Sequence, residues 1–234
     1  MNIFINNNFS GFFIIENKAV HHTIFQKLKN LLLSLFFGLV IITLCVAVLI
    51  FPLDIFISKY LHFESIRSLI HISQEKQRTI PFYIIVFIGP FIEEILFRLA
   101  LKVNKFNIAF FFGIFTYLLL GGSITKFDIN NTFFLYNVVS SITISILSYY
   151  FLSKTITNFL NQKINYLILL SIVLFGFVHI SNIKILHWQL TMLYPFYVLP
   201  QMVIGYFITN LRLKYGFLWG FSLHVLTNAL STLL

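Results

Sequence analysis

Long apolar runs alternate with short polar segments along almost the whole chain. About 20 apolar residues in a helix cross a bilayer core about 30 Å thick. Runs of this size predict membrane spans at 31–51, 80–102, 106–121, 133–152, 165–186, 191–210 and 216–234. The third run is short, and residues 9–15 could form an interfacial helix, so counts of six to eight spans stay open.

The fold class expected from this pattern is all-α: a polytopic membrane bundle of about seven transmembrane helices. Residues 1–30 are expected to form a juxtamembrane tail, and residues 31–234 a single transmembrane domain. The longest polar stretch, 52–79, mixes acidic and basic residues and is expected to be a surface helix or loop over the bundle.

Composition supports the membrane assignment. Hydrophobic residues make up 59% of the 234-residue chain and charged residues only 10%, against about 25% charged in an ordinary soluble domain. The net charge of +9 comes from scattered lysines and arginines that form no dense cluster, which excludes nucleic acid as the expected partner. The lipid bilayer is therefore an expected partner.

The distribution of basic residues predicts the orientation. With the amino terminus inside, the inner segments hold nine basic residues and the outer segments six, which fits the excess of Lys and Arg found on the cytoplasmic side. Residues 1–30 lack the features of a cleaved secretory signal. We therefore expect a multi-pass protein of a bacterial plasma membrane with its amino terminus inside.

Almost every ionisable residue in the spans falls at one of three places. They are Glu93, Glu94 and Arg98 in the second span, His179 in the fifth, and His224 with Asn228 in the seventh. Ionisable groups at this depth avoid lipid, so they are expected to face the interior of the bundle and one another.

Helical spacing suggests roles for these residues. Glu94 and Arg98 are four residues apart and can form an ion pair on one helix face. Glu93 is rotated about 100° from Glu94, which leaves it as a candidate base. His224 and Asn228 are also four apart and could offer two hydrogen-bond donors to an oxyanion.

Structural explanations compete with these roles. A single membrane histidine more often serves as a hydrogen-bond partner than as a catalyst, and a Glu–Arg pair can simply join two helices. Cys45 lies in an apolar run and is expected to be a small packing residue. His21 and His22 have no third ligand nearby and fit a hydrated tail better than a metal site.

Three segments resemble, in order, the three motifs of the CPBP family, which comprises the type II CAAX prenyl proteases and the bacteriocin-processing or Abi intramembrane proteases. The motifs are Glu-Glu-x-x-x-Arg at 93–98, Phe-x-x-x-His at 175–179 and His-x-x-x-Asn at 224–228, and the resemblance covers about residues 80–234.

This resemblance implies a membrane-embedded endopeptidase that cleaves a peptide or protein substrate at or in the membrane. It implies that Glu93 and His179 activate water and that His224 and Asn228 stabilise the oxyanion. Glu94 and Arg98 would orient the site. The family's structural picture favours a glutamate mechanism without a metal cofactor, and the chain has no His-Glu-x-x-His motif, although the spacing alone leaves a metal possible.

Two other function classes compete with the protease. One is a catalytically silent membrane scaffold or immunity protein of the same fold, in which the motif residues join helices. The other is a proton-coupled transporter that uses the carboxylates as a relay. The transporter is less favoured because the chain shows no inverted repeat and no paired helix breaks in corresponding halves.

Overall fold

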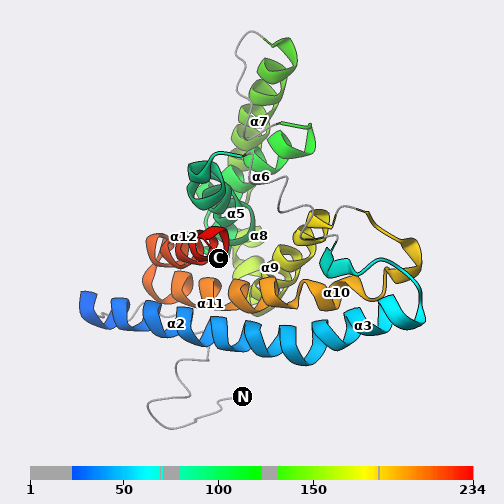
Figure 1. Cartoon of the computed structure of the whole chain (residues 1–234). Helices are drawn as coiled ribbons and strands as arrows, with labels where there is room; N and C mark the ends of the chain where they lie inside the picture. The colour runs from blue at the N-terminus through cyan, green and yellow to red at the C-terminus, as the bar shows by residue number, and fades with distance from the viewer. Residues whose placement is uncertain (1–22, 69, 71–79, 123–130, 184, 234) are drawn as a thin grey trace. The chain divides into compact units, whose positions relative to one another are not determined.

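Helices make up the part of the chain that the structure, a computed structural model, describes (Figure 1). The described residues are 23–68, 70, 80–122, 131–183 and 185–233; they are 86% helical and include no strand. The all-α prediction is therefore confirmed. The possible interfacial helix at 9–15 and the pair His21 and His22 lie outside the described residues.

The helices divide into two compact units. Unit 1 takes its described residues from Met1–Ser73 and Gly176–Thr227, and unit 2 from Gln74–Phe175 and Asn228–Leu234.

Unit 1 contains one long continuous helix. It is formed by α2 (Ile24–Cys45), the π-helical turn η1 (Val46–Ile50) and α3 (Phe51–Tyr60). The helix begins at Ile24 rather than at residue 31 because Thr23 and Gln26 form a reciprocal capping box, with backbone-to-side-chain hydrogen bonds of 3.0 and 3.3 Å. It continues past residue 51 through the π-helical turn η1, and Pro52 is the second residue of α3 directly after that turn.

Helix α11 (Leu199–Tyr215) packs along α2, and the two lie side by side (Figure 1). Gly38 permits the close approach: a Cβ there would lie 3.2 Å from Cδ1 of Ile204. The short helix α10 (Tyr194–Tyr197) precedes α11, and α12 (Phe217–Leu233) follows it after Gly216, whose φ of 100° favours glycine.

A second part of unit 1 is built on a buried acid. Asp54 accepts hydrogen bonds from Tyr197 Oη at 2.9 Å, from the Arg67 backbone N–H at 3.4 Å and from Ser65 Oγ. The surrounding apolar core consists of Ile50, Ile57, Ile66, Ile183, Leu190, Tyr194 and Tyr197. The carboxylate thus joins α3 to α10 and to the segment that follows α3.

Replacing Asp54 with Ala is expected to destabilise the protein by about 1–3 kcal/mol, because the buried Tyr197 hydroxyl loses its acceptor. Thermal unfolding of the full chain in mild detergent measures the loss. Glu64→Ala, which removes an exposed acid from the same region, serves as the control. Equal unfolding temperatures for the two variants would contradict the anchoring role of Asp54.

Unit 2 begins with the π-helical turn η2 (Ile84–Ile88), α5 (Gly89–Arg98) and the 3-10 turn η3 (Leu99–Leu101). Helices α6 (Lys105–Leu119) and α7 (Thr132–Phe151) follow and pack closely against each other. A Cβ on Gly113 would lie 3.1 Å from Cβ of Ser145, whose hydroxyl donates to the carbonyl of Ala109 at 3.0 Å. Helices α8 (Lys154–Gln162) and α9 (Ile164–Val178) come next in the chain.

Three of the described helices are long and apolar enough to cross a membrane: Ile24–Tyr60, Thr132–Phe151 and Ile164–Asn182. This supports a membrane protein, but the predicted seven spans are not confirmed. Helices α11 and α12 have 17 residues each, about 26 Å at 1.5 Å per residue. The run at 80–102 changes helix type at Gly89 and again at Leu99.

Candidate functional site

A side chain from elsewhere in unit 2, that of Asn228, hydrogen-bonds to the helix break before Glu93. In the π-turn η2, the Gly89 N–H bonds the carbonyl of Ile84, five residues earlier. The N–H that would reach the Ile85 carbonyl in the same register belongs to residue 90, and Pro90 has none. Asn228 Nδ2 supplies this bond instead, at 3.0 Å. Asn228 therefore holds the turn from which α5 starts.

Replacing Asn228 with Ala is expected to cost about 1–3 kcal/mol, because the Ile85 carbonyl loses its donor. In a Pro90→Ala background, residue 90 regains an N–H, so the same Asn228→Ala change should cost less. Unfolding of the two single variants and the double variant in detergent forms a double-mutant cycle. Strictly additive losses would contradict the coupling between Asn228 and the proline break.

Glu94 and Arg98 form the ion pair that their spacing predicts, Glu94 Oε1 contacting Arg98 Nη1. Both side chains have 0% exposure. The Arg98 guanidinium also lies over the ring of Phe175, with its Cζ 4.2 Å from the ring centroid. Cation–π contact of this kind is strongest where water is excluded. The three side chains make one buried cluster, which we call the Glu94–Arg98–Phe175 cluster.

Helix α9 fixes the end of α5. Ser171 and Phe175 are four residues apart on α9 and so share a face. Ser171 Oγ donates to the Phe97 carbonyl at 2.5 Å, and the ring of Phe97 meets Phe175 edge-on with centroids 5.6 Å apart. These contacts occur where α5 gives way to the 3-10 turn η3. The carboxyl end of α5 is thus held against α9 through the contacts of Phe97 and Arg98.

Glu93 occupies a different face of α5 from Glu94, as the helical rotation predicts. Glu94 is fully buried, whereas Glu93 is partly exposed with its Oε2 atom buried. A carboxylate that is partly exposed can contact a substrate or a water molecule, while its buried oxygen lies in a region from which water is excluded. Of the two adjacent acids, Glu93 is therefore the better candidate for chemistry.

The two histidines belong to unit 1. His179 is the first residue of the 3-10 turn η4 (His179–Asn182), directly after α9 ends, and is partly buried. His224 lies in α12 and is 2% exposed. Their meeting with Glu93 in one pocket stays a prediction, whereas the contacts of Glu94, Arg98 and Asn228 are formed within unit 2.

Gly176 lies in close contact with α11. A Cβ there would lie 2.4 Å from Cγ and 2.9 Å from Cε of Met202 in α11. Gly176→Leu is therefore expected to disrupt packing beside His179 and to cost about 1–3 kcal/mol through overpacking. Unfolding in detergent measures this loss, and a second substitution, Met202→Ala, should restore part of it. No recovery in the double variant would contradict the contact.

Some residues that build the site were not assigned by sequence reasoning. The sequence indicates Phe175 only as a motif position four residues before His179 and Pro90 only as a helix break, and it assigns no role to Ser171. The spacing of Ser171 and Phe175 was the available signal, because residues four apart on a helix can contact the same neighbour. Among the described residues, no three His, Cys, Asp or Glu side chains gather as a metal site would need.

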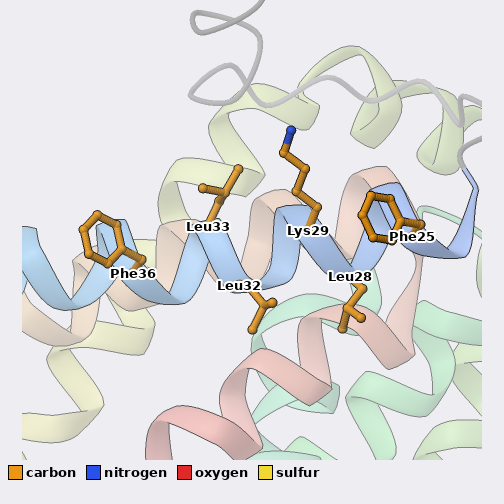
Figure 2. Close-up of a pocket in the computed structure, with 6 residues that line it drawn as sticks. All are labelled: Phe25, Leu28, Lys29, Leu32, Leu33 and Phe36. Atoms are coloured by element: carbon orange, nitrogen blue, oxygen red, sulfur yellow. The ribbon is translucent and has the colours of Figure 1, made fainter.

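An open hollow of about 410 Å³ lies along the first half of α2 (Figure 2). Its lining residues are Phe25, Leu28, Lys29, Leu32, Leu33 and Phe36. Leu28 and Leu32 point to one side of the helix, and Lys29 points to the other (Figure 2). Lys29 is the only ionisable group in this lining. The hollow therefore offers no acid or histidine for catalysis.

No protein-family model matches the chain, and no curated protein and no solved structure is significantly similar to it.

Proposed function

We propose that the chain is an intramembrane endopeptidase similar to the CPBP family, acting on a peptide or protein substrate at or in the membrane. The observation that carries the proposal is the pair of adjacent acids on α5. Glu94 is neutralised by Arg98 in a buried cluster, and Glu93 beside it is partly accessible.

In the proposed reaction, Glu93 accepts a proton from a water molecule, with His179 as the second group that activates this water. The water oxygen attacks the carbonyl carbon of the substrate peptide bond and forms a tetrahedral oxyanion. The proton held by Glu93 then passes to the leaving amide nitrogen as the carbon–nitrogen bond breaks. The products are a carboxylate and an amine.

The proposed oxyanion donors are His224 and Asn228. Preorganised donors are most effective in a site from which bulk water is excluded. An amide nitrogen carries two hydrogens, so the bond from Asn228 to the Ile85 carbonyl leaves the second for the oxyanion. Asn228 would then both hold the turn before α5 and face the substrate.

The Glu94–Arg98 pair supports this mechanism electrostatically. Two adjacent carboxylates in a low-dielectric region disfavour each other's charged form. The guanidinium of Arg98 beside Glu94 offsets this repulsion within α5.

A comparison of cells that carry the wild-type protein with cells that carry Glu93→Gln tests the proposal. Quantitative proteomics of the membrane fraction should find an uncleaved precursor that accumulates only with the variant. Glu64→Gln, which alters an exposed acid away from α5, should match the wild type. Identical precursor levels in all three strains would contradict a peptidase role for Glu93.

A catalytically silent membrane scaffold is the second candidate. It is favoured by one observation: Glu94, Arg98 and Asn228 all make contacts that stabilise unit 2. Deletion of the gene should give cells a phenotype, and expression of the Glu93→Gln protein in those cells distinguishes the two functions by whether it restores the wild-type phenotype. Full rescue selects the scaffold, and failed rescue by a stably inserted variant selects the peptidase.

A further inference from the structure

Helix α8 has a strongly two-sided character. Its apolar residues Ile156, Phe159 and Leu160 have the spacing that places them on one face, while the opposite face is formed by threonine, asparagine, glutamine and lysine. No residue of α8 is buried. Ile156 is 44% exposed and Phe159 57% exposed. The described part of the chain therefore covers the apolar face of this helix only in part.

The connections of α8 indicate where it lies. It stands between α7, which ends at Phe151, and α9, which begins at Ile164. Both neighbours belong to the helices that are long and apolar enough to cross a membrane. A nine-residue helix tied at both ends to spanning helices is held at one surface of the bilayer. The exposed apolar side chains of α8 then meet lipid.

Exposed tyrosines lie at the two helix ends that flank α8. Tyr149 and Tyr150 lie in the last turn of α7, and Tyr166 lies in the first turn of α9. They are 45%, 77% and 70% exposed. Tyrosine prefers the membrane–water interface because it combines an apolar ring with a polar hydroxyl. The ends of both flanking helices thus carry interfacial residues beside α8.

The charge of the segment is entirely positive. Lys154 begins α8 and Lys163 follows its last residue, and the sequence contains no Asp or Glu after Asp128. Lys163 Nζ lies 5.7 Å from the ring centroid of Tyr166. A lipid headgroup that carries a net negative charge complements this pair of lysines. The distribution of basic residues also predicts that this segment is cytoplasmic.

We propose that α8 is an interfacial helix that binds anionic phospholipid. Ile156, Phe159 and Leu160 insert at the boundary between headgroups and acyl chains, and Lys154 and Lys163 contact the headgroup phosphates. This proposal is independent of the proposed peptidase activity, because no residue of α8 belongs to the candidate site.

Fluorescent labelling of the full chain tests the insertion. In a Cys45→Ser background, Phe159→Cys labels the apolar face and Asn158→Cys labels the polar face one residue away. Each variant carries an environment-sensitive probe and is placed in nanodiscs of phosphatidylcholine with phosphatidylglycerol. The probe at position 159 should show blue-shifted emission and quenching by lipids with a nitroxide on the acyl chain. The probe at position 158 should instead be quenched by aqueous iodide.

The proposal is overturned when the probe at 159 is quenched by iodide as strongly as the probe at 158. It is also overturned when the probe at 159 is shielded from both quenchers, because the apolar face would then pack against protein.

A charge variant tests the choice of lipid. With the probe at 159, the blue shift should increase when phosphatidylglycerol is added to phosphatidylcholine. Lys154→Gln combined with Lys163→Gln should abolish this increase, whereas the control Lys59→Gln combined with Lys102→Gln should retain it. An unchanged dependence on phosphatidylglycerol in the Lys154 and Lys163 variant would refute the headgroup contacts.

Discussion

Replacing Glu93 with Gln is expected to abolish cleavage of the precursor identified in cells, with a loss of about 10²-fold to 10⁴-fold. The amide keeps the size of the side chain but cannot accept the proton of the attacking water, and general-base catalysis contributes about this factor. The cleavage rate of the purified full chain in phospholipid vesicles measures the effect.

Thermal unfolding separates this loss of activity from a loss of fold. Glu93→Gln should unfold near the temperature of the wild type, because Glu93 is partly exposed and lies outside the Glu94–Arg98–Phe175 cluster. Glu94→Gln should lower that temperature, because it leaves the buried Arg98 charge without a carboxylate. Undiminished cleavage by Glu93→Gln would refute its role as the base.

Replacing Arg98 with Met is expected to destabilise the protein by about 3–5 kcal/mol. The substitution leaves the charge of Glu94 buried and uncompensated, which is the costly way to break a buried ion pair. A double variant, Glu94→Leu with Arg98→Met, replaces the pair with apolar residues of similar size and should recover most of the loss. Methionine also packs favourably on an aromatic ring, here that of Phe175.

Lys102→Met is the matched control for Arg98→Met, because Lys102 is an exposed basic residue just after the same helical segment. Unfolding of all three variants in one detergent provides the comparison. A loss for Arg98→Met no larger than that for Lys102→Met would show that the buried pair does not stabilise unit 2.

The apolar pattern predicted the ends of some helices closely and those of others poorly. Capping residues and helix breaks account for the difference. The runs at 106–121 and 133–152 match α6 and α7 nearly end to end, because Asn104 and Asn131 cap their first turns. The run at 80–102 was predicted as one helix. Pro90 and the π-turn before it divide that run, and hydropathy does not record a change of helix type.

The candidate site was predictable only where its contacts are local. The Glu94–Arg98 pair follows from a four-residue spacing, which any helix brings together. The bond from Asn228 to the Ile85 carbonyl joins residues 143 positions apart. The contact of Arg98 with Phe175 likewise depends on how α9 packs against α5. Tertiary packing of this kind leaves no periodic signal in one sequence.

Cysteine cross-linking tests most directly the central claim, which is that Glu93 meets His179 and His224 in one pocket. In a Cys45→Ser background, Glu93→Cys is paired with His179→Cys or with His224→Cys, and the full chain is oxidised in native membranes. Gly113→Cys with Ser145→Cys is the positive control, because the Cβ positions lie 3.1 Å apart. The account predicts intramolecular cross-links from position 93 to both histidine positions. A cross-linked control with no cross-link from position 93 to either histidine position would contradict it.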